Sequence, residues 1–226
     1  MPGRLYIVAT PIGNLKDITY RAVEILSSVD IIAAEDTRTT RKLLTHYGIT
    51  GKRLVSYFEH NERERATRLL DLINEGMDVA LVSEAGTPAI SDPAYRVVSL
   101  AVKEGIKVVP IPGPSALTAA LSISGLPTDR FMFVGFLPDK GGKRKRRLEE
   151  LKDVDATLIF FVSKWKIKRI LDEMYEVFGE RRCCLMREAT KLNEEILYEN
   201  LSSLVPLVQK TDVKGEVTLI VAPPEG

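Results

Sequence analysis

The sequence predicts an α/β protein made of two α/β domains, an N-terminal one with a parallel, doubly wound sheet and a C-terminal one with a mixed sheet. In the first half of the chain, short runs rich in β-branched residues alternate with segments of helical periodicity. In the second half, some runs are joined by loops too short for a crossover helix, which requires antiparallel pairs. A length of 226 residues with 45% apolar residues is sufficient for two such cores.

The first domain is expected to span residues 1–113. Its helices are expected where apolar residues recur at positions i, i+3, i+4 and i+7, and its strands are expected at the apolar runs between them. The strands are predicted at residues 5–9, 30–34, 54–58, 79–82 and 107–111, and helical periodicity is found at residues 18–29, 66–73 and 94–102.

The second domain is expected to span residues 114–226. The string PIPGPSALTAALSISGLP predicts a hinge between the domains, because prolines and glycines punctuate it and its alanine-rich middle favours a helix. No long flexible linker separates the two halves, so a ligand cleft is expected between them. The strands of this domain are predicted at residues 131–136, 157–162, 182–188, 195–199 and 216–221.

Composition excludes several classes of protein. Cys183 and Cys184 are the only cysteines and are adjacent, so they predict neither a disulfide framework nor secretion, and a reducing cytoplasm is expected. With only His46 and His60 as further soft ligands, no metal site is predicted. No apolar run reaches the ~18 residues of a membrane span, and the apolar stretch at the N-terminus is too short for a signal peptide, so no membrane partner is expected.

Three turn-rich loops at predicted strand ends are the candidate ligand site. The glycine patterns of dinucleotide-binding folds, P-loops and serine hydrolases are absent. Residues 10–14, 83–92 and 110–115 are instead rich in proline and glycine, which hold backbone groups ready for a small ligand. Open α/β sheets bind ligands in the loops at the carboxyl ends of their strands. Asp17 follows the first of these loops and Asp92 ends the second, and both are expected to be helix N-caps.

Seven segments across both domains carry a resemblance to a known family. They are LYIVATPIGNLKDIT, AAEDTRTT, VSEAGTPAISDP, PIPGPSAL, GLPTDRFMFVGFLP, REATK and KGEVTLIV. In this order they resemble the bacterial ribosomal RNA small subunit methyltransferase I family. That family is a branch of the tetrapyrrole methylases, which use S-adenosylmethionine without the usual glycine loop.

The resemblance implies a cytoplasmic homodimer that binds S-adenosylmethionine in the cleft between its domains. It also implies methylation of a cytidine ribose 2′-hydroxyl in the decoding region of 16S ribosomal RNA. Residues 133–137 and 215–219 would close the far side of the cofactor site. Residues 162–166 depart from the family's Glu-Ser-x-His-Arg string, so no role is carried over to them. The implied cofactor-binding residues are Pro11, Ser83, Gly86, Thr87, Pro88, Pro112, Gly113, Ser115 and Ala116.

Methylation of a hydroxyl depends chiefly on alignment, with a base or a cation near the oxygen. Asp36 is the favoured catalytic candidate, because it closes an apolar strand at the end where the cofactor loops are expected. Lys191, which would stabilise a developing alkoxide, and His60, beside Glu59, are the other catalytic candidates. For each of them a helix cap or a surface ion pair is the alternative interpretation.

The basic string KGGKRKRR, residues 140–147, predicts contact with RNA phosphates in a chain that is otherwise acidic. Trp165, among lysines, is a candidate platform for base stacking. The candidate RNA-binding residues are Arg38, Lys143, Arg144, Lys145, Arg146 and Arg147. Two rival functions remain open: a methyltransferase acting on a tetrapyrrole or another small polyanion, and an RNA-binding protein without catalytic activity.

Overall fold

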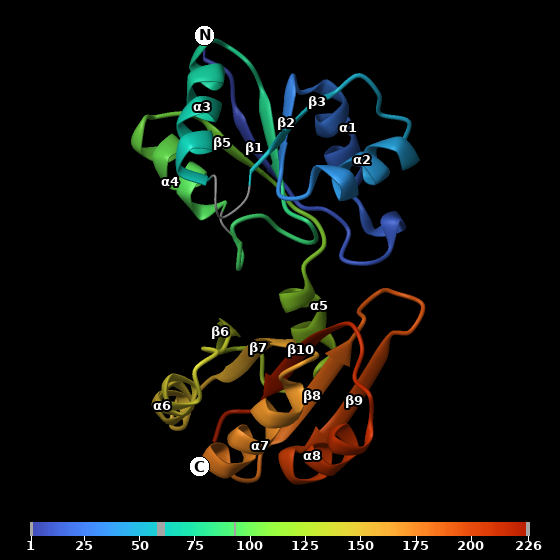
Figure 1. The fold of residues 1–226 in the computed structure, drawn as a ribbon, viewed down its shortest axis with the longest axis vertical. Helices are drawn as coiled ribbons and strands as arrows, with labels where there is room; N and C mark the ends of the chain where they lie inside the picture. Colours follow the sequence, from blue (N-terminus) through green and yellow to red (C-terminus); the bar gives the residue numbers. More distant parts are fainter. Residues whose placement is uncertain (1, 58–61, 93, 225–226) are drawn as a thin grey trace. The chain divides into compact units, whose positions relative to one another are not determined.

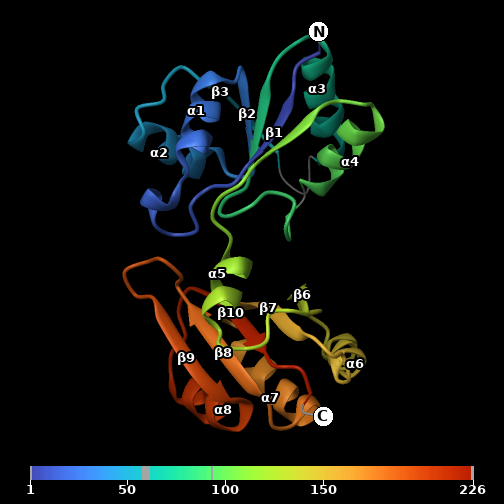
Figure 2. The same ribbon diagram turned by 180° about the vertical axis from the view of Figure 1, so that it is seen from behind.

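The computed structural model describes residues 2–57, 62–92 and 94–224 (Figures 1 and 2). The chain divides into two compact units, Met1–Ser115 and Ala116–Gly226. The division lies close to the boundary expected after residue 113. Each unit contains one sheet and its own helices, so the predicted fold class is confirmed.

The first unit is built on a five-stranded parallel sheet in the order β3-β2-β4-β1-β5. All five predicted strands form, to within a residue or two at their ends. Because every strand runs the same way, the loops that follow them gather at one edge of the sheet. The strands are β1 (Leu5–Val8), β2 (Ile31–Ala34), β3 (Arg53–Ser56), β4 (Val79–Val82) and β5 (Val108–Ile111).

Helices cover both faces of this sheet, as Figure 1 shows. α1 (Tyr20–Ser28) and α2 (Thr37–His46) pack against one face, and α3 (Glu62–Asn74) and α4 (Tyr95–Lys103) against the other. Neighbouring residues of β4 alternate between the two cores: Leu81 lies in one and Val82 in the other. Strands buried on both faces are continuously apolar, which is why these short runs were readable in the sequence.

The residues that begin helices α1 and α4 differ in part from the prediction. Thr19 caps α1, because its hydroxyl oxygen accepts a hydrogen bond from the Ala22 N–H (3.2 Å). Asp17 lies in a short 3₁₀ helix, η1 (Leu15–Asp17), too far ahead to reach that N–H, so its prediction as an N-cap was wrong. Asp92 is not an N-cap either, because the N-cap of α4 is Ala94, although Asp92 Oδ1 accepts a hydrogen bond from the Ala94 N–H at 2.8 Å.

The second unit holds a five-stranded mixed sheet in the order β6-β7-β10-β8-β9. Only β6 and β7 pair in parallel, and the remaining pairs are antiparallel, as the short connections predicted. The strands are β6 (Phe131–Phe136), β7 (Thr157–Ser163), β8 (Arg182–Arg187), β9 (Glu195–Asn200) and β10 (Glu216–Val221).

The helices of the second unit cover the two faces of its sheet unequally. α6 (Gly141–Leu151), α7 (Ile167–Phe178) and α8 (Leu201–Lys210) form the larger core on one face. α5 (Ala116–Ile123), the helix predicted within the hinge string, packs on the other face. α6 starts at Gly141, so the basic run forms the first turns of the helix rather than leading into it. None of the helices in the described parts of the chain combines the length and the apolar character of a membrane span.

The two cysteines are adjacent on β8, with Cys183 in one core of the second unit and Cys184 in the other. Successive side chains of a strand point to opposite faces, so the two sulfurs cannot bridge each other. Both thiols are free and buried. Burial raises the pKa of Cys183 to about 12 and that of Cys184 to about 11, so both stay protonated at neutral pH.

Candidate functional site

The loops after β1 and β4 are joined directly at the carboxyl edge of the first sheet. The Thr10 N–H donates to the Gly86 carbonyl and the Gly86 N–H donates to the Thr10 carbonyl, each at 2.9 Å. The Ser83 hydroxyl donates to the Gly86 carbonyl at 3.2 Å. This network fixes the backbone around two of the predicted cofactor segments.

The loop after β5 is bound to the other two loops by threonine hydroxyls. Thr87 donates to the Pro114 carbonyl at 3.2 Å, and Thr19 donates to the Pro112 carbonyl at 3.4 Å. The structure therefore brings together Pro11, Ser83, Gly86, Thr87, Pro88, Pro112 and Gly113 in one cluster of loops on the first unit. Ser115 ends that unit and Ala116 begins α5.

Two glycines make this close approach of loops possible. Gly86 has φ +83°, a conformation that L side chains rarely adopt. At Gly113 a Cβ atom would lie 3.0 Å from the Ala9 Cβ, and Ala9 is fully buried at the end of β1. Any side chain at residue 113 would therefore push the β5 loop away from β1.

Glu35 and Asp36 follow β2 at the same edge. The Glu84 N–H, in the loop after β4, donates to Glu35 Oε2 at 3.2 Å. Asp36 is the N-cap of α2: its Oδ1 accepts from the Arg38 N–H (2.7 Å) and its Oδ2 accepts from the Arg38 guanidinium (3.1 Å). These bonds from Arg38 hold the pKa of Asp36 below its ordinary value, so the carboxylate is a weak base. The Arg38 side chain is 86% exposed and can still meet an external anion.

Lys191 lies in the turn between β8 and β9 of the second unit. Its ammonium donates to Glu188 Oε1 and to Glu216 Oε2, each at 2.9 Å. Burial lowers the pKa of Lys191, but these hydrogen bonds outweigh it and the net shift is upward. Lys191 is therefore a fixed cation at neutral pH. Gly215 makes room for this cluster, since a Cβ there would lie 2.0 Å from Glu188 Oε1.

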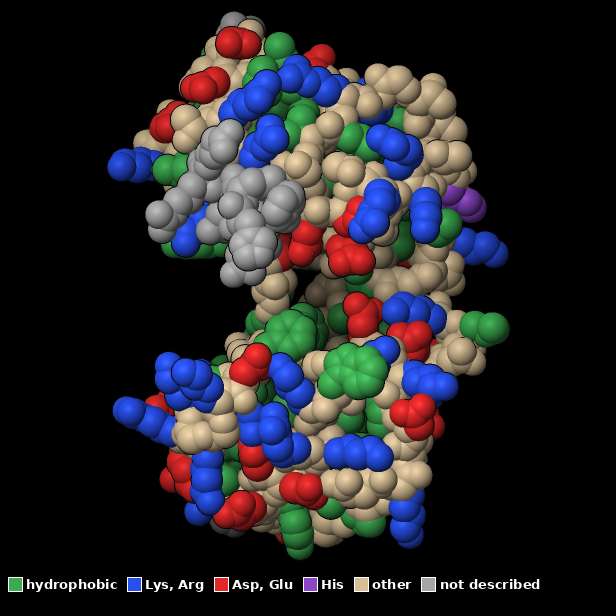
Figure 3. All heavy atoms as spheres, in the orientation of Figure 1, with side chains coloured by type: hydrophobic (Ala, Val, Ile, Leu, Met, Phe, Trp, Pro, Cys, Tyr) green, Lys and Arg blue, Asp and Glu red, His purple; other side chains and the backbone are tan. Residues whose placement is uncertain are grey.

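The basic residues of α6 have two different environments. Lys and Arg side chains gather over α6 in Figure 3. Lys143, Lys145 and Arg146 are exposed, and Arg147 is partly exposed. Arg146 and Arg147 share Glu150 (3.3 and 3.1 Å), and Lys145 pairs with Glu176, so this surface is partly neutralised.

Arg144 is buried, with 1% of its surface exposed. Its guanidinium donates to both carboxylate oxygens of Glu173 on α7, and also to the Pro138 and Asp139 carbonyls at 3.1 and 2.8 Å. A buried guanidinium with these partners cannot reach a phosphate group in solution. The prediction that Arg144 binds RNA was therefore wrong. Arg144 instead holds α6 to α7.

His60 and its neighbours Glu59 and Asn61 lie outside the described residues, so the catalytic role of His60 stays a prediction. Residues 133–137 and 215–219, expected on the far side of the cofactor, belong mainly to β6 and β10 of the second unit.

Comparisons with known proteins identify the family of this chain. The profile of the family described as "Tetrapyrrole (Corrin/Porphyrin) Methylases" matches residues 4–205. A Halalkalibacterium halodurans protein named ribosomal RNA small subunit methyltransferase I is 52% identical over 219 residues, 97% of this chain and 75% of the relative. A Thermotoga maritima protein of the same name is 44% identical over 220 residues, 97% of this chain and 98% of the relative. The chain belongs to the ribosomal RNA small subunit methyltransferase I branch of the tetrapyrrole methylases.

The fold of the tetrapyrrole methylases extends to distant solved structures. A uroporphyrin-III-C-methyltransferase from Thermus thermophilus has a TM-score of 0.68 to this chain at 20% identity, covering 97% of this chain and 94% of that one. At this identity the likeness shows a shared fold only.

S-adenosylmethionine is the cofactor of this tetrapyrrole methylase, and the loops of the first unit fit it. Asp92, in the loop after β4, accepts two backbone hydrogen bonds with Oδ1, but its buried Oδ2 has no partner among the described residues. The loop thus keeps an unused acceptor for an amine or hydroxyl donor. The carboxylate of Glu35 at the same edge suits a cationic sulfonium, whereas that of Asp36 is already paired with Arg38. The residues that would hold the cofactor here are Pro11, Ser83, Gly86, Thr87, Pro88, Pro112 and Gly113.

Sequence reasoning missed two of the three threonines that fix this site. Thr87 was among the expected cofactor-binding residues, but Thr10 and Thr19 were not, although their hydroxyl or backbone groups join the loops. A signal was present: Thr-Pro occurs in the loops after both β1 and β4, at residues 10–11 and 87–88. Proline fixes the backbone after each threonine, which helps to hold the threonine in place.

Replacing Gly113 by alanine is expected to weaken S-adenosylmethionine binding about fivefold or more, because overpacking of this kind costs ~1–3 kcal/mol. Isothermal titration calorimetry measures the change. The double variant Ala9→Gly/Gly113→Ala removes the facing methyl group and should recover affinity. Gly142→Ala, where a Cβ meets nothing within 4 Å, is the control. Unchanged affinity of Gly113→Ala would place the cofactor elsewhere.

Proposed function

We propose that this chain uses S-adenosylmethionine to methylate ribosomal RNA of the small subunit, at the ribose 2′-hydroxyl of a cytidine in the decoding region of 16S RNA. The observation that carries the proposal is the identity of 52% across nearly the whole chain to a protein named ribosomal RNA small subunit methyltransferase I. The structure supports it with a preorganised loop cluster and with exposed cations on both units.

S-adenosylmethionine supplies an activated methyl group on a sulfonium. The residues of the chain then have to bind the cofactor and the RNA, orient the ribose hydroxyl toward the methyl group, and balance the charge that develops on its oxygen. Asp36 is already bonded to Arg38 and has a lowered pKa, so we assign it a positioning role: it fixes the Arg38 guanidinium, which holds a phosphate of the RNA. Lys191, cationic between Glu188 and Glu216, is the alternative group that stabilises the oxygen as its proton leaves.

The RNA-binding surface proposed for the second unit consists of Lys143, Lys145, Arg146 and Arg147 on α6 together with Trp165. The phosphate backbone supplies the counter-charge that Glu150 alone cannot give to Arg146 and Arg147. Trp165 is 84% exposed, and the Lys164 ammonium lies 4.8 Å from its ring centroid. An exposed ring beside a cation offers a base both a stacking face and charge.

Replacing Trp165 by alanine is expected to reduce RNA affinity by a factor between about 5 and about 150, since stacking one base contributes ~1–3 kcal/mol. Fluorescence anisotropy with a labelled fragment of 16S RNA measures the change. Trp165→Phe keeps a stacking face and should retain most of the affinity. Equal affinities of the alanine variant and the unchanged protein would show that Trp165 has no part in binding.

We further propose that the chain forms a homodimer in the cytoplasm, where small subunits are assembled. Light scattering of the purified protein tests the oligomeric state, and a monomer at micromolar concentration would overturn that part of the proposal.

The proposed activity is tested by incubating the protein with labelled S-adenosylmethionine and small ribosomal subunits that lack the modification. Naked 16S RNA is assayed in parallel, and mass spectrometry of RNA fragments locates the methyl group. A label on one cytidine ribose is the expected result. A label on the base, or on another nucleotide, would contradict the finer part of the proposal. RNA binding without transfer would favour a non-catalytic protein, and transfer to a tetrapyrrole alone would favour the small-polyanion alternative.

A further inference from the structure

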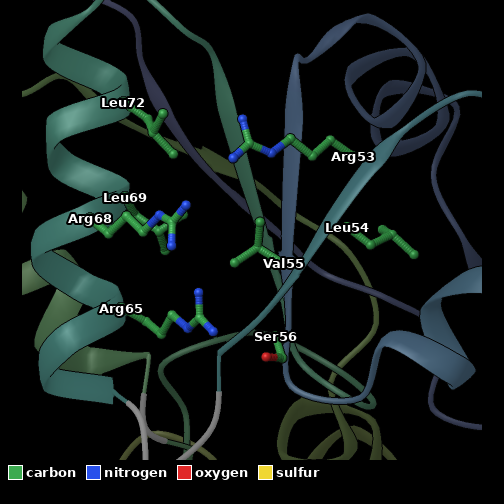
Figure 4. A pocket seen from close by; sticks show the side chains of 8 residues that line it. All are labelled: Arg53, Leu54, Val55, Ser56, Arg65, Arg68, Leu69 and Leu72. Atoms are coloured by element: carbon green, nitrogen blue, oxygen red, sulfur yellow. The ribbon is translucent and has the colours of Figure 1, made fainter.

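A groove of about 300 Å³ lies between the edge strand β3 and helix α3 of the first unit, apart from the cofactor loops (Figure 4). Arg53 reaches from β3 toward α3, and Arg65 and Arg68 reach from α3 toward β3, so three guanidinium groups enter one hollow. Apolar side chains, Leu69 and Val55 among them, form the rest of its wall. Figure 3 shows Lys and Arg side chains exposed over this groove.

The charges of these arginines are not neutralised within the described part of the protein. Elsewhere in the chain, arginine commonly has a carboxylate partner: Arg4 pairs with Asp78, and Arg187 with Glu195. No such partner, and no hydrogen bond, is found for Arg53, Arg65 or Arg68 among the described residues, and the described side chains that line the groove include no carboxylate. Guanidinium groups that converge on an apolar wall repel one another unless an anion lies between them.

The dimensions of the groove favour a chain of phosphates over a single small anion. Its strand side runs the length of β3, from Arg53 to Ser56, which is about 10 Å at the usual rise per residue. Ser56 pairs with Ala34 at the end of β2, and Glu35 and Asp36 follow Ala34. The groove thus leads toward the edge of the sheet that carries the candidate site. Guanidinium groups recognise phosphate oxygens by paired hydrogen bonds.

We propose that Arg53, Arg65 and Arg68 form a phosphate-binding groove that holds the backbone of the RNA substrate on the first unit. This inference rests on the proposed function, and it adds a contact separate from α6 and from Arg38. The groove contributes affinity and fixes the direction of the strand, without reading its sequence.

The test is the dependence of RNA affinity on salt concentration, measured with small ribosomal subunits that lack the modification. Each lost phosphate contact removes about 0.7 from the slope of log affinity against log salt for single-stranded RNA. Arg65→Gln/Arg68→Gln is therefore expected to lower the slope by about 1.4, and Arg53→Gln by about 0.7. Affinity for S-adenosylmethionine should stay unchanged in both variants.

The control is Lys103→Gln/Lys107→Gln, which removes two exposed cations of the same unit outside the groove and should leave the slope unchanged. Equal slopes for the arginine variants and the unchanged protein would overturn the inference. So would binding of inorganic phosphate that depends on Arg65 and Arg68 while RNA binding does not. Failure of the proposed function is recognised separately, as absence of methyl transfer by the unchanged protein.

Discussion

Replacing Arg144 by alanine is expected to lower the free energy of unfolding by about 3–5 kcal/mol, because it leaves the Glu173 carboxylate, 21% exposed, without its buried partner. It also removes the hydrogen bonds that Arg144 gives to the Pro138 and Asp139 carbonyls before α6. Chemical denaturation followed by circular dichroism measures the loss. Lys143→Ala, one residue away and exposed, is the matched control and should change stability by less than ~0.5 kcal/mol.

In RNA binding, the effects of changing the two positions should be reversed. Lys143→Ala is expected to reduce the salt dependence of RNA affinity, because it removes an exposed cation. The variant Arg144→Lys, provided that it folds, should keep that salt dependence. The Arg144 guanidinium holds the pKa of Glu173 below its ordinary value of 4.5. The stability that the pair contributes is therefore present above pH 4.5 and is lost as the pH falls through the lowered pKa. A loss below 1 kcal/mol in Arg144→Ala would contradict the role assigned to this ion pair.

Changing Asp36 to asparagine is expected to slow methyl transfer about 100-fold at saturating substrates, far more than it weakens either binding step, because a misplaced Arg38 no longer aligns the RNA. Asparagine keeps the helix cap but gives up the charge that fixes Arg38. Single-turnover kinetics with labelled S-adenosylmethionine measures the rate. Because Arg38 holds the pKa of Asp36 below 3.8, the rate should show no acid limb from this group between pH 5 and 8.

A double-variant cycle separates positioning from capping. If Asp36 acts through Arg38, then Arg38→Gln should slow transfer as well, and the double variant should be no slower than the slower single one. Ser27→Ala, which removes a hydroxyl that donates only to the Val23 carbonyl within α1 and changes no charge, should leave the rate unchanged. A near-normal rate in Asp36→Asn would return Asp36 to the role of a helix cap and direct attention to Lys191 and His60.

The fold was predictable because its signals are local. β2 and β4 are apolar at every position, since both faces of the sheet are covered, and the helices between strands carry one apolar face each. The start of α6 was not predictable in the same way. Its first residues, two glycines and five successive cations, include no apolar side chains whose spacing could indicate a helix. Only Leu148 and Leu151, near its end, indicated one.

The candidate site was predictable as a set of loops but not as a set of contacts. Proline and glycine marked the three loops, and the parallel sheet implied that they share an edge. The role of Arg144 depends on Glu173, which is 29 residues away in the sequence. No local sequence pattern predicts contact between residues so far apart. The Arg53, Arg65 and Arg68 groove likewise joins a strand to a helix and was not anticipated.

The positions of Cys183 and Cys184 allow partial unfolding of the second unit to be followed by the alkylation of its thiols. The first unit has no cysteine, and both thiols of the second unit are buried and protonated in the folded state. An alkylating reagent can therefore react only when the second unit opens, because reaction requires an accessible thiolate. The rate of alkylation measures the opening of the second unit alone, because unfolding of the first unit exposes no thiol.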